Sequence, residues 1–159
     1  MLQELADELT RVVDEAAIDL RTITETAAAA KRAPHVWSIK EILGHLLDSA
    51  ANNHQRFVRA QQANELSFPG YDQDAWVQSQ DHQSRPWLET IEFWARYNHH
   101  LAHTIRRIPE RALNVPCRIA TNEPVTLGFL AEDYLAHLRH HLKQINERRA
   151  ASAWSRRAR

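Results

Sequence analysis

Hydrophobic residues recur every three to four positions along four long stretches of the chain. The first stretch runs from Leu2 to about Leu20, the second from Ile39 to about Ala63, the third from Pro86 to Ile108, and the fourth from Leu127 to about Arg149. This spacing places the hydrophobic side chains on one face of a helix. The pattern therefore predicts four long amphipathic helices.

The residues at the ends of these stretches are typical of helix caps and connections. Ser38-Ile-Lys-Glu41 matches a capping box ahead of the second helix, and Thr126 can cap the fourth. Residues 68–84 are expected to form a loop with one helical turn around Trp76, and Asn114 to Pro124 an irregular crossover. Helices connected in this way indicate an all-α protein, an up-and-down four-helix bundle or a close relative of it.

Length and composition favour one bundle domain over residues 1–150, followed by a basic tail over residues 151–159 that we expect to be disordered. The formal net charge is zero, which gives no global attraction for nucleic acid, and we expect none to bind. The sequence shows neither a signal peptide nor an apolar stretch approaching the ~20 residues that span a bilayer, so no membrane association is expected. The single cysteine, Cys117, cannot form an internal disulfide, which fits the reducing cytoplasm.

Ten histidines raise the question of metal binding, and their positions on the predicted helices separate them. His99 and His103 lie opposite the hydrophobic stripe of the third helix and are expected to face solvent. His137 and His141 are four residues apart on the fourth helix and face inward, close enough to bind one ion. From spacing alone, a pair of hydrogen-bonded core histidines explains them equally well.

A polar stripe on the second helix contains His45, Ser49, Asn52 and Arg56. The periodicity leaves two interpretations open. The stripe is either a solvated face or one wall of a polar cleft within the bundle.

Three segments together resemble the DinB/YfiT-like superfamily, in its DinB_2-type branch. These segments are Trp37-Ser-Ile-Lys-Glu-Ile-Leu-Gly-His45-Leu-Leu-Asp-Ser49, Phe68-Pro-Gly-Tyr71, and His137-Leu-Arg-His-His141-Leu-Lys-Gln-Ile145. The resemblance implies a four-helix bundle, often a homodimer, with a divalent transition metal, commonly zinc or nickel. The metal ligands that it implies are His45, His137 and His141.

The resemblance also implies a class of chemistry, because three protein ligands leave a coordination position open for an exchangeable group. We expect a metal-dependent enzyme that activates a low-molecular-weight thiol as co-substrate for S-transfer to an electrophilic small molecule. The alternatives are a hydrolase that uses metal-bound hydroxide and a non-catalytic metal-binding stress-response module. Asp48, Asn52 and Arg56 are candidates for supporting the ligands or binding the substrate, although an ordinary surface salt bridge explains Arg56 as well.

Overall fold

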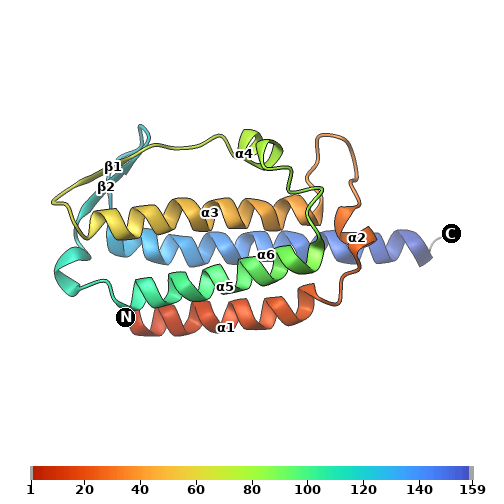
Figure 1. Ribbon diagram of the computed structural model, residues 1–159, viewed down its shortest axis with the longest axis horizontal. Coiled ribbons are helices and arrows are strands. Elements are labelled where there is room, and N and C mark those ends of the chain that lie inside the picture. The colour runs from red at the N-terminus through yellow and green to blue at the C-terminus, as the bar shows by residue number, and fades with distance from the viewer. Residues whose placement is uncertain (1, 158–159) are drawn as a thin grey trace.

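Four long helices lie side by side along the length of the molecule (Figure 1). The computed structural model describes residues 2–157, with side chains for residues 2–150. The long helices are α1 (Leu2–Leu20), α3 (Ile39–Ala60), α5 (Trp87–Arg106) and α6 (Leu127–Arg157). They confirm the four predicted helices and the all-α bundle. The side chains of residues 151–159 lie outside the described part, so the disordered basic tail stays a prediction.

The helices do not simply alternate in direction. Figure 1 shows that α3 and α5 run the same way, while α1 and α6 run the opposite way. Residues 61–86 therefore return along the whole bundle between α3 and α5, and they form β1 (Leu66–Phe68) and α4 (Gln73–Ser79). The connection between α5 and α6 begins with a turn of 3-10 helix, η1 (Glu110–Ala112). The fold is thus a close relative of the up-and-down bundle, and α4 confirms the helical turn expected around Trp76.

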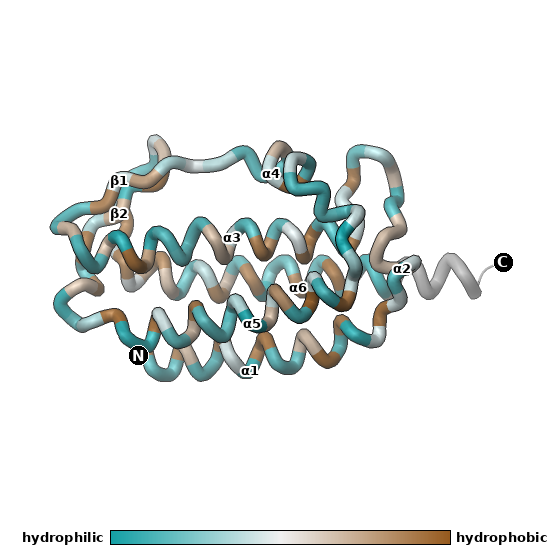
Figure 2. The backbone as a smooth tube through the Cα atoms, viewed as in Figure 1, coloured by the Kyte–Doolittle hydropathy of each residue, from teal (hydrophilic) through white to brown (hydrophobic). Residues whose placement is uncertain are grey.

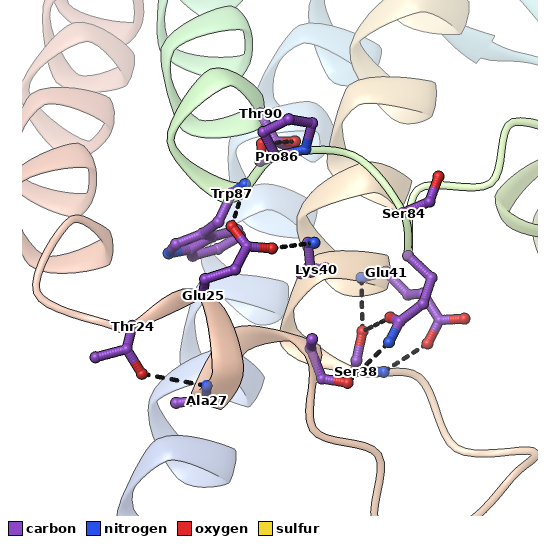
Figure 3. A network of polar contacts seen from close by, with 12 residues as sticks. Thr24, Glu25, Ala27, Ser38, Lys40, Glu41, Ser84, Pro86, Trp87 and Thr90 are labelled. Atoms are coloured by element: carbon purple, nitrogen blue, oxygen red, sulfur yellow. Dashed lines mark hydrogen bonds and ion pairs between the residues drawn. The ribbon is translucent and has the colours of Figure 1, made fainter.

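A short helix at one end ties α3 and α5 together. This helix, α2 (Glu25–Ala29), is capped by Thr24. The Glu25 carboxylate accepts hydrogen bonds from the Lys40 ammonium group and, at 2.8 Å, from the backbone N–H of Trp87 (Figure 3). Lys40 and Trp87 belong to the first turns of α3 and α5, so this contact holds the two helix N-termini side by side.

A small sheet closes the other end of the bundle. β1 pairs in parallel with β2 (Pro116–Ile119), which pairs antiparallel with β3 (Val125–Thr126). The expectation of an irregular crossover over Asn114 to Pro124 is therefore wrong for β2. The physical reason is that β2 finds its hydrogen-bonding partner in a distant segment, with Leu66 opposite Cys117 and both side chains buried.

The core lies between the four long helices. Hydrophobic and hydrophilic positions alternate along each of them (Figure 2), and the hydrophobic ones form a single buried cluster. Its largest side chains include Trp87, Trp94 and Tyr134. The Tyr134 hydroxyl donates a hydrogen bond of 2.5 Å to Oδ1 of Asn98, so its polar atom is paired inside the core. Among the described helices, none has the length and apolar character needed to cross a bilayer.

Candidate metal centre

Three imidazole rings from two helices meet at one point beside the core. Nε2 of His137 lies 3.1 Å from Nε2 of His141 and 3.4 Å from Nε2 of His45. One ligand atom from each of the three residues lies within 4.8 Å of the other two. The structure thus brings together the three residues that the sequence singled out.

The local structure explains why these rings meet. His137 and His141 are separated by one turn of α6, and their ring centroids are 4.5 Å apart. His45 lies on α3, which is antiparallel to α6 in the bundle (Figure 1). The capping box fixes where α3 begins, because Ser38 Oγ accepts from the N–H of Glu41 and the Glu41 carboxylate accepts from the N–H of Ser38.

The second nitrogen of each ring has a different environment. Nδ1 of His141 lies 2.9 Å from Oε1 of Gln144, an acceptor, so this nitrogen carries the proton and Nε2 keeps its lone pair. Nδ1 of His137 lies 3.4 Å from the Ser49 hydroxyl. Nδ1 of His45 is buried without a hydrogen-bond partner among the described residues.

Electrostatics keep the three rings neutral. Burial, and after it the neighbouring His141 and His137, lower the pKa of His45 from 6.5 to about 4, against the opposing effect of Asp48. Burial and the charges of His141 and His140 likewise lower the pKa of His137 to about 4. Burial also lowers the pKa of His141. At neutral pH the lone pairs are therefore available, which is the state that a metal ion requires.

The donor set fits one divalent transition-metal ion. Two nitrogens at ~2.0–2.1 Å from a tetrahedral ion lie about 3.3 Å apart, close to the two Nε2 separations of 3.1 Å and 3.4 Å. Without a cation, Nε2 of His137 can donate a hydrogen bond of 3.1 Å to Nε2 of His141. A shared cation would instead accept a lone pair from each of the three rings.

Aromatic and polar side chains surround the three histidines. The Trp37 ring lies 5.1 Å from the His45 ring, and the Tyr71 ring lies 6.5 Å from it. His141 also borders a hollow of about 390 Å³ that opens to the surface between Trp37 and Gln144. A small molecule can therefore approach His141 from outside. Trp37 and Tyr71 thus lie beside the His45 ring.

Asp48, expected to support a ligand imidazole, has other partners. Its Oδ1 accepts a hydrogen bond of 2.6 Å from Gln80 and lies 3.1 Å from Nε2 of His82. Asp48 and His82 are both 2% exposed. No hydrogen bond joins Asp48 to the three histidines within the described residues. Asp48 therefore acts on His45 through its negative charge, which raises the pKa of that imidazole. His82 was missed by sequence reasoning, and the only signal for it is Gly44, where an added Cβ would lie 2.2 Å from the His82 ring.

His99, His103 and the polar candidates Asn52 and Arg56 have partners other than the three histidines. His99 and His103 are exposed, as expected, and His99 pairs with Asp14 at 2.8 Å. Nδ2 of Asn52 donates to the backbone oxygen of Asp48. The Arg56 guanidinium packs over the Phe68 ring, 5.5 Å from its centroid, and donates to Asn53. His140 is exposed and lies 3.0 Å from Gln144, the residue that contacts His141.

Comparison with known proteins places this arrangement in a family. No curated protein matches the sequence. The fold is similar to the solved structure of YfiT from Bacillus subtilis, with a TM-score of 0.80 and 19% identity, over 94% of this chain and 88% of that one. YfiT is described as "a probable metal-dependent hydrolase with an unusual four-helix bundle topology". The family model of the DinB superfamily matches residues 2–145, and the chain belongs to that superfamily.

Proposed function

We propose that this chain is a metal-dependent enzyme that activates a low-molecular-weight thiol for transfer to an electrophilic small molecule. His45, His137 and His141 would hold one divalent transition metal, with zinc or nickel the best candidates. The single observation that carries the proposal is the convergence of three neutral imidazoles beside a hollow that opens to solvent.

When bound, the metal would supply Lewis-acid chemistry that favours the thiolate form of a co-substrate at neutral pH. The chain's own residues would keep the imidazoles deprotonated and oriented, Gln144 by accepting from Nδ1 of His141. In the transfer, the thiol proton leaves to solvent and the sulfur forms a bond to the electrophilic carbon. The leaving group departs with its electron pair.

The choice of a thiol over water rests on the family resemblance and on how few further side chains the chemistry needs. A metal-held thiolate needs no general base once its proton is lost. No aspartate or glutamate of the described residues hydrogen-bonds to the three rings, but Asp74 borders the hollow beside His141 and is the candidate base if hydrolysis is the activity. The thiol would come from outside the protein, because Cys117 is fully buried in β2 and burial raises its pKa.

Hydrolysis is the second candidate, favoured by the description of YfiT as a probable metal-dependent hydrolase. A non-catalytic metal-binding module is the third. Only the first should show a rate that depends on added thiol. We further propose a small-molecule substrate, no nucleic-acid partner and a homodimer in the cytoplasm; analytical ultracentrifugation would test the dimer.

The proposal is tested first by metal content. Protein purified without an affinity tag should carry about one equivalent of transition metal, and His137→Ala and His141→Ala should lose it. His99→Ala and His103→Ala are the matched control, because this pair has the same spacing on an exposed helix face. A wild type that neither carries nor takes up zinc or nickel would refute the metal site.

Activity is then assayed with the metal-loaded protein. Glutathione, bacillithiol and mycothiol would each be incubated with a chloroaromatic or haloalkane electrophile, and the thioether product quantified. A thiol-dependent rate that is lost in both α6 variants supports S-transfer. Ester or amide hydrolysis without thiol would instead establish the second candidate.

A further inference from the structure

A second hollow borders Tyr71, the residue whose ring lies near His45. Its volume is about 410 Å³, within the range of small-molecule sites, and residues of α3 form one side. Four aromatic side chains border it, Phe68, Tyr71, Trp76 and Tyr97. The Tyr71 and Trp76 rings lie 4.9 Å apart and are inclined at 50°. Flat apolar surfaces set at an angle are suited to holding another ring.

The electrostatics of this hollow disfavour charged ligands. No charged side chain of the described residues is among those that border it. The electron-rich ring faces repel an anion, and the nearby Arg56 guanidinium, which would attract one, is already engaged by the Phe68 ring and by Asn53. A cation would be attracted to those faces, but the Arg56 guanidinium already packs against Phe68, 5.5 Å from the ring centroid, and repels a second positive charge. An uncharged ligand meets neither penalty.

Two amide side chains on α3 give the hollow a polar edge. Nδ2 of Asn52 donates to the backbone oxygen of Asp48, which leaves Oδ1 of Asn52 as an acceptor. Oε1 of Gln55 accepts from Arg59, which leaves Nε2 of Gln55 as a donor. The two residues are three positions apart and so lie on one face of the helix. Together they suit a neutral group that both donates and accepts, such as a hydroxyl or a primary amide.

Tyr71 connects this hollow to the histidines. Its ring borders the hollow and also lies 6.5 Å from the His45 ring. Within the described residues its hydroxyl has no hydrogen-bond partner, so no polar contact of that hydroxyl fixes the ring in place. We propose that the hollow binds an uncharged aromatic ring with a neutral hydrogen-bonding substituent. Its assignment as the subsite for the electrophilic substrate rests on the proposed function.

The test uses three probes of matched shape, 2-naphthalenemethanol, 2-naphthoate and 2-naphthylmethylammonium. Titration calorimetry on metal-free protein should show that the alcohol binds roughly tenfold more tightly than either charged probe. Trp76→Ala should weaken binding of the alcohol by roughly tenfold, and Phe129→Ala, an exposed aromatic residue on α6 outside the hollow, should leave it unchanged. Trp76 is 37% exposed, so its loss should not unfold the protein.

A charge placed in the hollow gives an independent variant. Gln55→Glu should weaken binding of the alcohol, whereas Gln62→Glu, an exposed position outside the hollow, should not. Equal affinities for the three probes, or an alcohol affinity unaffected by both Trp76→Ala and Gln55→Glu, would overturn the proposal.

A paramagnetic ion separates this proposal from the proposed function. Protein loaded with cobalt(II) should shift the proton resonances of the bound alcohol, and His137→Ala should bind the alcohol without that shift. If the protein takes up no cobalt but binds the alcohol, the metal site fails and the aromatic site stands. If cobalt binds and the alcohol does not, the aromatic site fails alone.

Discussion

Replacing Gly44 with alanine should destabilise the protein, although alanine is the better helix former. Gly44 lies inside α3, next to His45, and the His82 side chain packs directly against it. An added Cβ would lie 2.2 Å from Cγ, 2.4 Å from Cδ2 and 2.5 Å from Cβ of His82. These separations are far shorter than van der Waals contact, so His82 must move. His82 is 2% exposed and has no free space to move into without disturbing its neighbours.

The expected cost follows from three contributions. Overpacking a buried site costs about 1–3 kcal/mol. A displaced His82 leaves the buried Asp48 carboxylate with one donor fewer, which costs about 1–3 kcal/mol. The higher helix propensity of alanine stabilises the folded protein by about 1 kcal/mol and offsets part of this loss. We expect the free energy of unfolding to fall by about 1–5 kcal/mol, a decrease in Tm of roughly 2–20 °C for a domain of this size.

Urea denaturation followed by circular dichroism measures this change, and Gly128→Ala is the matched control. Gly128 also lies in a helix, but there the nearest atom to an added Cβ is 3.5 Å away, an ordinary contact. Gly128→Ala should be neutral or stabilising by up to about 1 kcal/mol.

A double-mutant cycle tests the cause of the loss. In a His82→Gly background all three clashing atoms, Cβ included, are absent, so adding Gly44→Ala should cost nothing or stabilise the protein. The close packing of residues 61–86 against α3 would be refuted by either of two results. One is a wild-type stability for Gly44→Ala alone, and the other is an equal loss of stability with and without the His82 side chain.

Three further predictions concern stability. In metal-free protein the pKa values of His45 and His137 are lowered to about 4, so the unfolded chain takes up protons near pH 6.5 that the folded chain does not. The free energy of unfolding, measured by urea denaturation, should therefore be highest above pH 6.5 and fall as the pH drops toward 4. Replacing either histidine with glutamine should make this pH dependence weaker. Tyr134→Phe should lower the free energy of unfolding by about 1–3 kcal/mol in the same assay, because Oδ1 of Asn98 would lose its buried donor; an unchanged midpoint would contradict this. Ser38→Ala removes the buried cap of α3 and should cost about 0.5–2 kcal/mol in thermal denaturation, while threonine should retain most of the stability.

The helices could be predicted because their signals are local. The capping box from Ser38 to Glu41 and the cap at Thr126 act within one turn, and both are formed in the structure. The sheet could not be predicted, because β1 and β2 are short and lie about fifty residues apart. Neither strand has enough alternating positions to stand out, and Pro116 indicates irregular structure. Only the fold brings the two strands together.

The histidines show the same division between local and distant signals. The spacing of His137 and His141 indicated a shared inward face, but the polar stripe of α3 was ambiguous, and His45 needed the family resemblance. His82 has no periodic context in the sequence. An isolated glycine within a hydrophobic helix, Gly44, is the one sign that another group approaches there.

The direction of the helices explains why the polar stripe of α3 is buried. Every residue from Ile39 to Ala50 is buried, although a helix at the edge of a four-helix bundle normally exposes one face. Because α3 and α5 run the same way, the connection between them must return along the bundle, and it covers the face of α3 that would otherwise meet solvent (Figure 1). That connection carries both Tyr71 and His82. The same topological feature therefore shields the polar side chains of α3 from bulk water and provides the aromatic wall beside His45, which a simple up-and-down bundle with a short turn at this point would lack.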